Sequence, residues 1–175
     1  SIRFGQRGNA LDFQVYGWSK PESEWTWIEG TRACLSFDLN DSTDDIWVCI
    51  NVHPMLVDGY QRLSVTVNDV MVGTHRFLDD RWTNVCMLIP NNLICDKMAT
   101  KMIFQAHSAT KPNDTDVRRL SLQVTDVCIY QWSQLQTEVM SKTRKFDDEF
   151  YIQKYPDVID YLSENNQYTP YDHYL

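Results

Sequence analysis

The sequence lacks any apolar run that approaches the roughly 20 residues a helix needs to cross a bilayer. Glycine and proline are scarce, with six of each in 175 residues, so a low-complexity or collagen-like chain is excluded. The hydrophobic fraction of 43% and the aromatic fraction of 13% exclude an intrinsically disordered chain. The composition therefore predicts one soluble globular domain with room for a short appendage.

The sequence also lacks a basic stripe. The net charge is −8, and seven carboxylates against Lys154 give residues 146–175 a charge of −6. The remaining residues are close to neutral with interspersed signs, which offers nothing to neutralise phosphates, so nucleic acid is not an expected partner. The seven acidic residues are Asp147, Asp148, Glu149, Asp157, Asp160, Glu164 and Asp172.

No C-x-x-C pair occurs, and the cysteine count is odd. Four of the five cysteines lie in or beside apolar, strand-like runs, where cysteine behaves as a small buried hydrophobe. We expect free, reduced thiols and a cytoplasmic chain, because disulfides are rare in the cytosol. The spacing does not suit zinc. The five are Cys34, Cys49, Cys86, Cys95 and Cys128.

Catalytic motifs are absent as well. The sequence contains no G-x-S-x-G, H-E-x-x-H, P-loop or G-x-G-x-x-G pattern, so we expect neither an enzyme nor a cofactor. Asp41, Asp44 and Asp45 could hold calcium, but a solvated turn is favoured because no D-x-D-x-D-G loop is present. No bound metal is expected.

Alternation of apolar and polar residues dominates the first 130 residues. Ala33, Leu35, Phe37 and Leu39 face one way, the pattern of a half-buried antiparallel strand. Asn68-Asp69 predicts a tight turn inside a hairpin over 62–77. The pattern predicts a mainly β fold, an antiparallel β-sandwich or jelly roll. Further expected strands are 12–16, 46–52, 84–89, 101–106 and 119–130.

The character of the sequence changes after Tyr130. We expect a β-sandwich domain over 1–130, a linker or connecting helix over 131–145, and the start of an acidic α-helical segment over 146–175. Asp147 is placed to cap the first helix of that segment, and Pro156 to begin a second. The pattern breaks off inside an expected helix, which predicts a piece cut from a larger protein.

Two stretches resemble a known group of proteins. The run Gly17-Trp18-Ser19-Lys20-Pro21-Glu22, followed by Trp25, Trp27 and Gly30, resembles the opening of β-sandwich modules attached to bacterial glycosyltransferases that build surface polysaccharides. Asp116-x-x-Arg119-Leu120-x-Leu122 fits the same pattern, although Ser121 and Asp69 stand where those modules have glycine. The segment F-D-x-E-F-Y-x-x-x-Y-P-D-V at 146–158, with P-x-x-H-Y-L at 170–175, looks like a helical segment of the same enzymes.

That resemblance implies an accessory, carbohydrate-binding-module-like domain. Trp18, Trp25 and Trp27 are the leading contacts, because a flat indole face can stack on the C–H face of a sugar ring. The alternative is that tryptophans in a sandwich are core residues. The expected carbohydrate-binding set is Trp25, Trp27, Trp18, Glu22, Arg118, Arg119, Asp116 and His107.

The charged members of that set have alternatives too. For Glu22, as for Glu24, an exposed and solvated carboxylate is the favoured alternative to a contact with sugar hydroxyls. Arg119 is expected to pair with Asp116 or Glu22, while an anionic sugar is the functional alternative for the arginines. His107 and His53 each end a strand-like run, where a histidine is more often structural than ligand-binding.

The leading function is a non-catalytic module that holds a surface polysaccharide or oligosaccharide near the glycosyltransferase domains of the same chain. Through the parent protein, the domain would work in the cytoplasm, including the inner face of the membrane. The alternative is a docking or spacer domain that makes protein–protein contacts without binding sugar.

Overall fold

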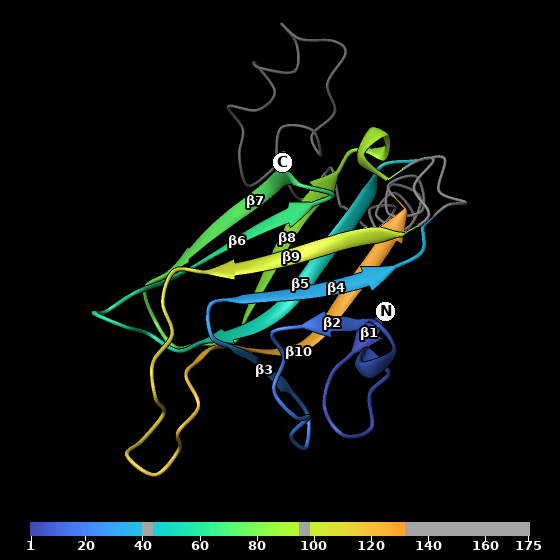
Figure 1. Cartoon of the computed structure of the whole chain (residues 1–175). Coiled ribbons are helices and arrows are strands. Elements are labelled where there is room, and N and C mark those ends of the chain that lie inside the picture. The colour runs from blue at the N-terminus through green and yellow to red at the C-terminus, as the bar shows by residue number, and fades with distance from the viewer. Residues whose placement is uncertain (40–43, 95–98, 132–175) are drawn as a thin grey trace, which may run out of the picture. The chain divides into compact units, whose positions relative to one another are not determined.

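The computed structural model describes residues 1–39, 44–94 and 99–131, which form two antiparallel β-sheets packed face to face (Figure 1). The core between the sheets is apolar. On β5 (Ile46–Pro54), alternate residues from Ile46 to Val52 are at most 1% exposed, and the residues between them face outward. This alternation is the predicted period of two, and it confirms the antiparallel sandwich.

Sheet A has the strand order β1-β10-β5-β8, and β3 also pairs with β10. The long strand β10 is central to it, since one part of β10 pairs with β3 and another part with β1. A bulge between Val124 and Asp126 interrupts the pairing of β10 with β5. In addition to β5, sheet A contains β1 (Ile2–Arg3), β3 (Thr26–Glu29), β8 (Thr83–Ile89) and β10 (Leu120–Gln131).

Sheet B has the order β2-β4-β9-β6-β7. The hairpin β6–β7 turns at Asn68 and Asp69, whose φ angles of 47° and 70° are those of a two-residue turn that favours Asn and Asp. This confirms the predicted hairpin. The strands are β2 (Gln14–Tyr16), β4 (Arg32–Phe37), β6 (Gln61–Val67), β7 (Val70–Phe77) and β9 (Thr100–Ala106).

Two short strands and two short helices were not predicted. β1 and β3 have four residues or fewer, and two 3₁₀ helices, Ala10–Asp12 and Asn91–Leu93, interrupt the loops. The expected strand over 12–16 is therefore helical at its first residue. The chain divides into the units Ser1–Ser133 and Gln134–Leu175. The expected linker and helical segment lie almost wholly outside the described residues, so they stay predictions.

The expectation of free thiols is wrong for two cysteines. Cys49 on β5 lies directly opposite Cys86 on β8, and the two form a disulfide with a Cα–Cα distance of 4.1 Å. The sequence hides this pair because 37 positions separate the two residues, and only the register of β5 and β8 brings them together. Cys34 and Cys128 are free thiols, and burial raises the pKa of the Cys34 thiol. Cys95 lies outside the described residues.

Nowhere in the described ranges is a helix both long and apolar enough to cross a membrane.

Candidate functional site

The three predicted tryptophans lie in or near the core. Trp18 packs against Phe4 and Phe104, with ring centroids 4.8 Å and 5.5 Å away, and its Nε1 donates to the Cys34 carbonyl oxygen at 2.9 Å. Trp27 on β3 is only 9% exposed. Trp25 is half-buried, and its enclosed Nε1 has no hydrogen-bond partner among the described residues. Trp18 therefore packs against the core and Trp27 is nearly enclosed, while Trp25, like Trp18, is half-buried.

The charged residues of the predicted set come together, but through a different arginine. Arg118 forms a bidentate pair with Asp116: its Nη2 donates to Oδ2 at 2.6 Å and its Nε to Oδ1 at 3.0 Å, and its Nη2 also lies 3.7 Å from Glu22. Hydrogen bonds from Arg118 hold the pKa of the Asp116 carboxyl below its usual range. Arg119, expected to make this pair, instead donates to the carbonyl oxygen of Ala109. These interactions of Arg118 and Arg119 stabilise the loop before β10.

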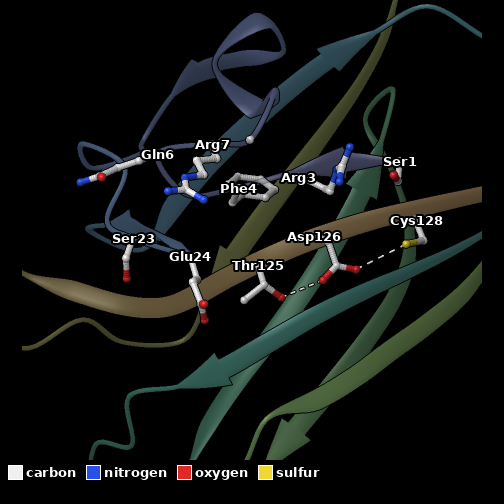
Figure 2. Close-up of a pocket in the computed structure, with 11 residues that line it drawn as sticks. Ser1, Arg3, Phe4, Gln6, Arg7, Ser23, Glu24, Thr125, Asp126 and Cys128 are labelled. Atoms are coloured by element: carbon white, nitrogen blue, oxygen red, sulfur yellow. Dashed lines mark hydrogen bonds between the residues drawn. The ribbon is translucent and has the colours of Figure 1, made fainter.

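A pocket of about 570 Å³ lies between the N-terminal segment, the loop at 23–24 and the outward side of β10 (Figure 2). β1 pairs with β10, and the Phe4 amide donates to the Thr125 carbonyl oxygen at 2.7 Å, which anchors the N-terminal segment to the bulge. The lining carries both signs of charge. Its polar side chains include Arg3, Gln6, Arg7, Ser23, Glu24, Thr125 and Asp126.

A polar track leads from this pocket across the outward side of sheet A. The Thr125 hydroxyl lies 2.8 Å from Asp126 Oδ2 and 3.1 Å from Asn51 Oδ1. Asn51 in turn donates from Nδ2 to Asn84 Oδ1 at 2.8 Å. The register explains the track, because Asp126, Asn51 and Asn84 are successive partners on β10, β5 and β8. Three strands thus present carboxylate, hydroxyl and amide groups in one row.

An exposed indole lies beside the track. Trp82 precedes β8, is 43% exposed, and contacts the His53 ring with a centroid distance of 5.2 Å. His53 belongs to the outward row of β5, two residues beyond Asn51. The imidazole holds the indole against the sheet, while much of the indole stays open to solvent. His53, considered as a strand-end residue in the sequence, supports an aromatic platform here.

His107 lies on the other sheet. Its ring stacks on Tyr60 with centroids 5.0 Å apart, and Tyr60 Oη is hydrogen-bonded to His107 Nε2. The Arg76 guanidinium lies 4.8 Å from the centre of the Tyr60 ring, a cation–π contact. The predicted residues are therefore not brought to one place: His107 belongs to sheet B, while Glu22, Asp116 and Arg118 gather beside the Trp25 loop.

The outward side of sheet B is a cationic surface that the sequence analysis missed. Its five strands contain no Asp or Glu, and Arg62 lies directly opposite Arg76. Arg32, Arg62, Arg76 and Lys101 form no salt bridge with the described residues. The sequence alone does not predict this surface, because the four cations lie on four different strands, among residues of mixed charge.

In the part of the chain that the structure describes, no three His, Cys, Asp or Glu side chains are grouped to hold a metal ion. Asp45 accepts a hydrogen bond from the Asn91 amide at 2.8 Å, so this carboxylate serves a loop contact. Asp41, from the calcium alternative, lies outside the described residues.

No protein-family model matches this chain, and no curated protein does. Solved structures similar to it include a family GH115 4-O-methyl-α-glucuronidase with specificity for decorated arabinogalactans, at a TM-score of 0.46 and 15% identity over 70% of this chain and 17% of that one. Another is the carbohydrate-binding module CBM36 in complex with calcium and xylotriose (TM-score 0.40, 8% identity, 74% and 94% coverage). A third is a family 35 carbohydrate-binding module from an environmental isolate (0.35, 17%, 75% and 92%).

These likenesses are distant, with every TM-score below 0.5, so they assign no ligand and no activity to this chain.

Sequence reasoning missed Trp82, the most useful of the exposed aromatics. The sequence offers only a weak indication that Trp82 is exposed, because Trp82 follows Asp79, Asp80 and Arg81 in a polar loop and lies in no apolar pattern. A tryptophan flanked by charged residues is nevertheless a poor core residue, and that feature separates Trp82 from Trp27.

Proposed function

We propose that this chain is a non-catalytic carbohydrate-binding module, and that the glycan lies on the outward side of sheet A. One observation carries the proposal: the 43%-exposed indole of Trp82 stands on His53 beside a row of carboxylate, hydroxyl and amide groups. A sugar ring has an apolar C–H face and a rim of hydroxyls. An open indole matches that face, and the row on β10, β5 and β8 matches the hydroxyls.

The pocket extends the proposed surface. Its wall includes Thr125 and Asp126 from the polar row, so a chain of sugars leaving Trp82 along the row reaches the pocket. Three strand spacings of about 4.8 Å separate β8 from β1, which gives the surface a span of roughly 14 Å. Arg3 and Arg7 at the far end supply guanidinium groups, which suit an acidic substituent.

The wider role follows from the sequence resemblance. The run at 17–30 and the segment at 146–175 resemble parts of polysaccharide-assembling glycosyltransferases. In that setting the module holds the growing glycan near the catalytic domain of the same chain. Tethering of this kind raises the local concentration of the acceptor without a new catalytic group.

Calorimetric titration with oligosaccharides from surface polysaccharides tests the proposal. Trp82→Ala is expected to weaken binding at least tenfold, because removing a central aromatic contact commonly costs more than about 1.4 kcal/mol. Tyr16→Ala is the matched control, since Tyr16 is 44% exposed but lies on β2 of the other sheet. It is expected to leave the dissociation constant unchanged.

Equal weakening by both variants, or none by Trp82→Ala, would remove Trp82 from the site. Trp25→Ala serves as a second comparison, because Trp25 lies in the loop that forms the pocket wall. Binding that depends on Trp25 and not on Trp82 would move the glycan to the pocket. No binding of any glycan by a folded chain would overturn the proposed function.

A docking or spacer function is the second candidate, and the free edges of the sheets favour it. β7 and β8 end their sheets, and neither pairs with a further strand among the described residues. β7 also exposes Val70 and Met71, which are 45% and 63% exposed. Such an edge can pair with a strand of another domain. Association that is abolished by Met71→Lys, measured by analytical ultracentrifugation, supports docking, whereas a monomeric wild-type chain argues against self-pairing.

A further inference from the structure

Three cysteines form one row across sheet A. Cys49 on β5 is the direct partner of Cys86 on β8 on one side and of Cys128 on β10 on the other. Directly opposed residues of antiparallel strands point to the same side of the sheet. All three side chains therefore share the outward side, with the Cys49–Cys86 disulfide occupying two positions and the free Cys128 thiol the third.

Cys128 is within reach of only one sulfur of that disulfide. Directly opposed partners have Cα atoms about 4.5–5.5 Å apart, which is inside the range of about 4.4–6.8 Å that a disulfide requires. Cys86 is two strands from Cys128, or roughly 10 Å. The order Cys128, Cys49, Cys86 also places the thiol on the side of Cys49 opposite its present partner, the direction from which a sulfur displaces another.

The thiol is accessible. Cys128 lines the pocket, where Figure 2 shows its sulfur beside Asp126, and the Sγ–Oδ1 distance is 3.4 Å. Rotation about the Cα–Cβ bond is needed to turn this sulfur toward Cys49. Cys86 is exposed on the edge strand β8, so it is open to solvent once released. Cys34, by contrast, is 2% exposed and belongs to sheet B.

We propose that Cys128, Cys49 and Cys86 form an intramolecular thiol–disulfide exchange site. The Cys128 thiolate forms a bond to Cys49 Sγ, the Cys49–Cys86 bond breaks, and its electron pair leaves on Cys86 Sγ, which takes up a proton. One disulfide and one thiol exist before and after, so neither oxidant nor reductant is consumed. The cross-link moves from β5–β8 to β5–β10, and the free thiol moves from the pocket wall to the sheet edge. The proposal does not rest on glycan binding.

Disulfide mapping of the full chain tests the exchange, in a Cys95→Ser background that leaves the row intact. The protein is held at pH 8 without added thiol or oxidant, quenched with acid, alkylated with N-ethylmaleimide and digested for mass spectrometry. Both linked peptides, Cys49–Cys86 and Cys49–Cys128, are expected, with label divided between Cys128 and Cys86. Their ratio is expected to stay constant on tenfold dilution. Label on Cys128 alone, a fully reduced row, or a ratio that changes with dilution would overturn the proposal.

Two single variants test whether Cys128 can contact Cys49, independently of any effect of the substitution on folding. Cys86→Ser leaves Cys49 and Cys128 as the two cysteines of the row, and these are expected to form a disulfide when glutathione disulfide is added. Cys49→Ser is the matched control, because the two cysteines that remain in the row, Cys128 and Cys86, lie two strands apart and are expected to stay alkylatable. Circular dichroism establishes that each variant is folded. Two free thiols in folded, oxidant-treated Cys86→Ser would also refute the inference.

Discussion

Removing the Cys49–Cys86 disulfide should cost the chain about 4 kcal/mol of stability. A cross-link restricts the unfolded chain, and the loss grows with the size of the closed loop, from about 3 kcal/mol for 15 residues to about 4.7 kcal/mol for 100. The two cysteines are 37 positions apart, which interpolates to about 4 kcal/mol. This value is an upper bound, because residual structure in the unfolded chain reduces it.

Urea unfolding of a Cys49→Ser, Cys86→Ser double variant measures the effect. With a slope of about 2 kcal/mol per molar urea, a loss of about 4 kcal/mol lowers the midpoint by roughly 2 M. The slope should also rise, because an unfolded chain without the cross-link exposes more surface. Cys128→Ser is the control, since its thiol lies in the same row but is not cross-linked; its midpoint should change little.

Reduction of the disulfide provides a second measurement of its contribution to the free energy of unfolding. Dithiothreitol should lower the wild-type midpoint to that of the double variant, and should leave the double variant unchanged. A double variant within 1 kcal/mol of the wild-type free energy of unfolding would refute the reasoning that the cross-link restricts the unfolded chain. A wild-type midpoint insensitive to reduction would do so independently.

Three further predictions concern single side chains. Gln61→Ala should cost about 2–4 kcal/mol in urea unfolding, because the buried Gln61 amide bonds both loops at its end of the sandwich, and its loss leaves their backbone groups unpaired. Arg62→Gln should leave the free energy of unfolding unchanged or raise it by a few tenths of a kcal/mol at low salt, because Arg62 lies opposite Arg76 and the two like charges repel. The gain should be absent in 0.5 M NaCl, where the repulsion is screened. A clear loss of stability at low salt would contradict this. Arg118→Gln should raise the pKa of the Asp116 carboxyl, followed by NMR titration. Because the pKa is depressed in the folded state, the stabilisation from this pair is present above the ordinary aspartate pKa and is lost as the pH falls through the folded value. An unchanged Asp116 titration in the variant would contradict that cause.

Local patterning was sufficient to predict most of the fold. The alternation in 46–52 and the Asn68-Asp69 turn are short-range features, and the structure confirms both. The short strands β1 and β3 were not predicted, because two to four residues are too few to show an alternating pattern. Their positions depend on pairing with β10, which is distant in sequence.

The site was harder to predict, because it depends on register. Arg118 and Arg119 are adjacent in sequence, and only the loop geometry decides which one meets Asp116. The same holds for Trp27 and Trp82: both are tryptophans, but Trp27 is 9% exposed and Trp82 is 43% exposed. The polar row, the cysteine row and the cationic surface each join residues from strands far apart in the chain.

The disulfide also bears on location. A cytoplasmic chain stays a prediction, and a stable cross-strand disulfide is uncommon in the reducing cytosol. Alkylation of the protein in its native cells, before lysis, measures whether Cys49 and Cys86 are linked there. Fully labelled cysteines would agree with a cytoplasmic location, and unlabelled ones would argue for an oxidising compartment.

Glycan binding on sheet A is tested most directly by the tryptophan indole signals in a two-dimensional ¹H–¹⁵N NMR titration with surface-polysaccharide oligosaccharides. The indole signal of Trp82, assigned by its loss in Trp82→Phe, should shift in a saturable way, as should the side-chain amides of Asn51 and Asn84. The indole signal of Trp18, which packs against Phe4 and Phe104, should stay in place. Saturable shifts confined to residues away from sheet A, or no shifts with any glycan, would contradict the account.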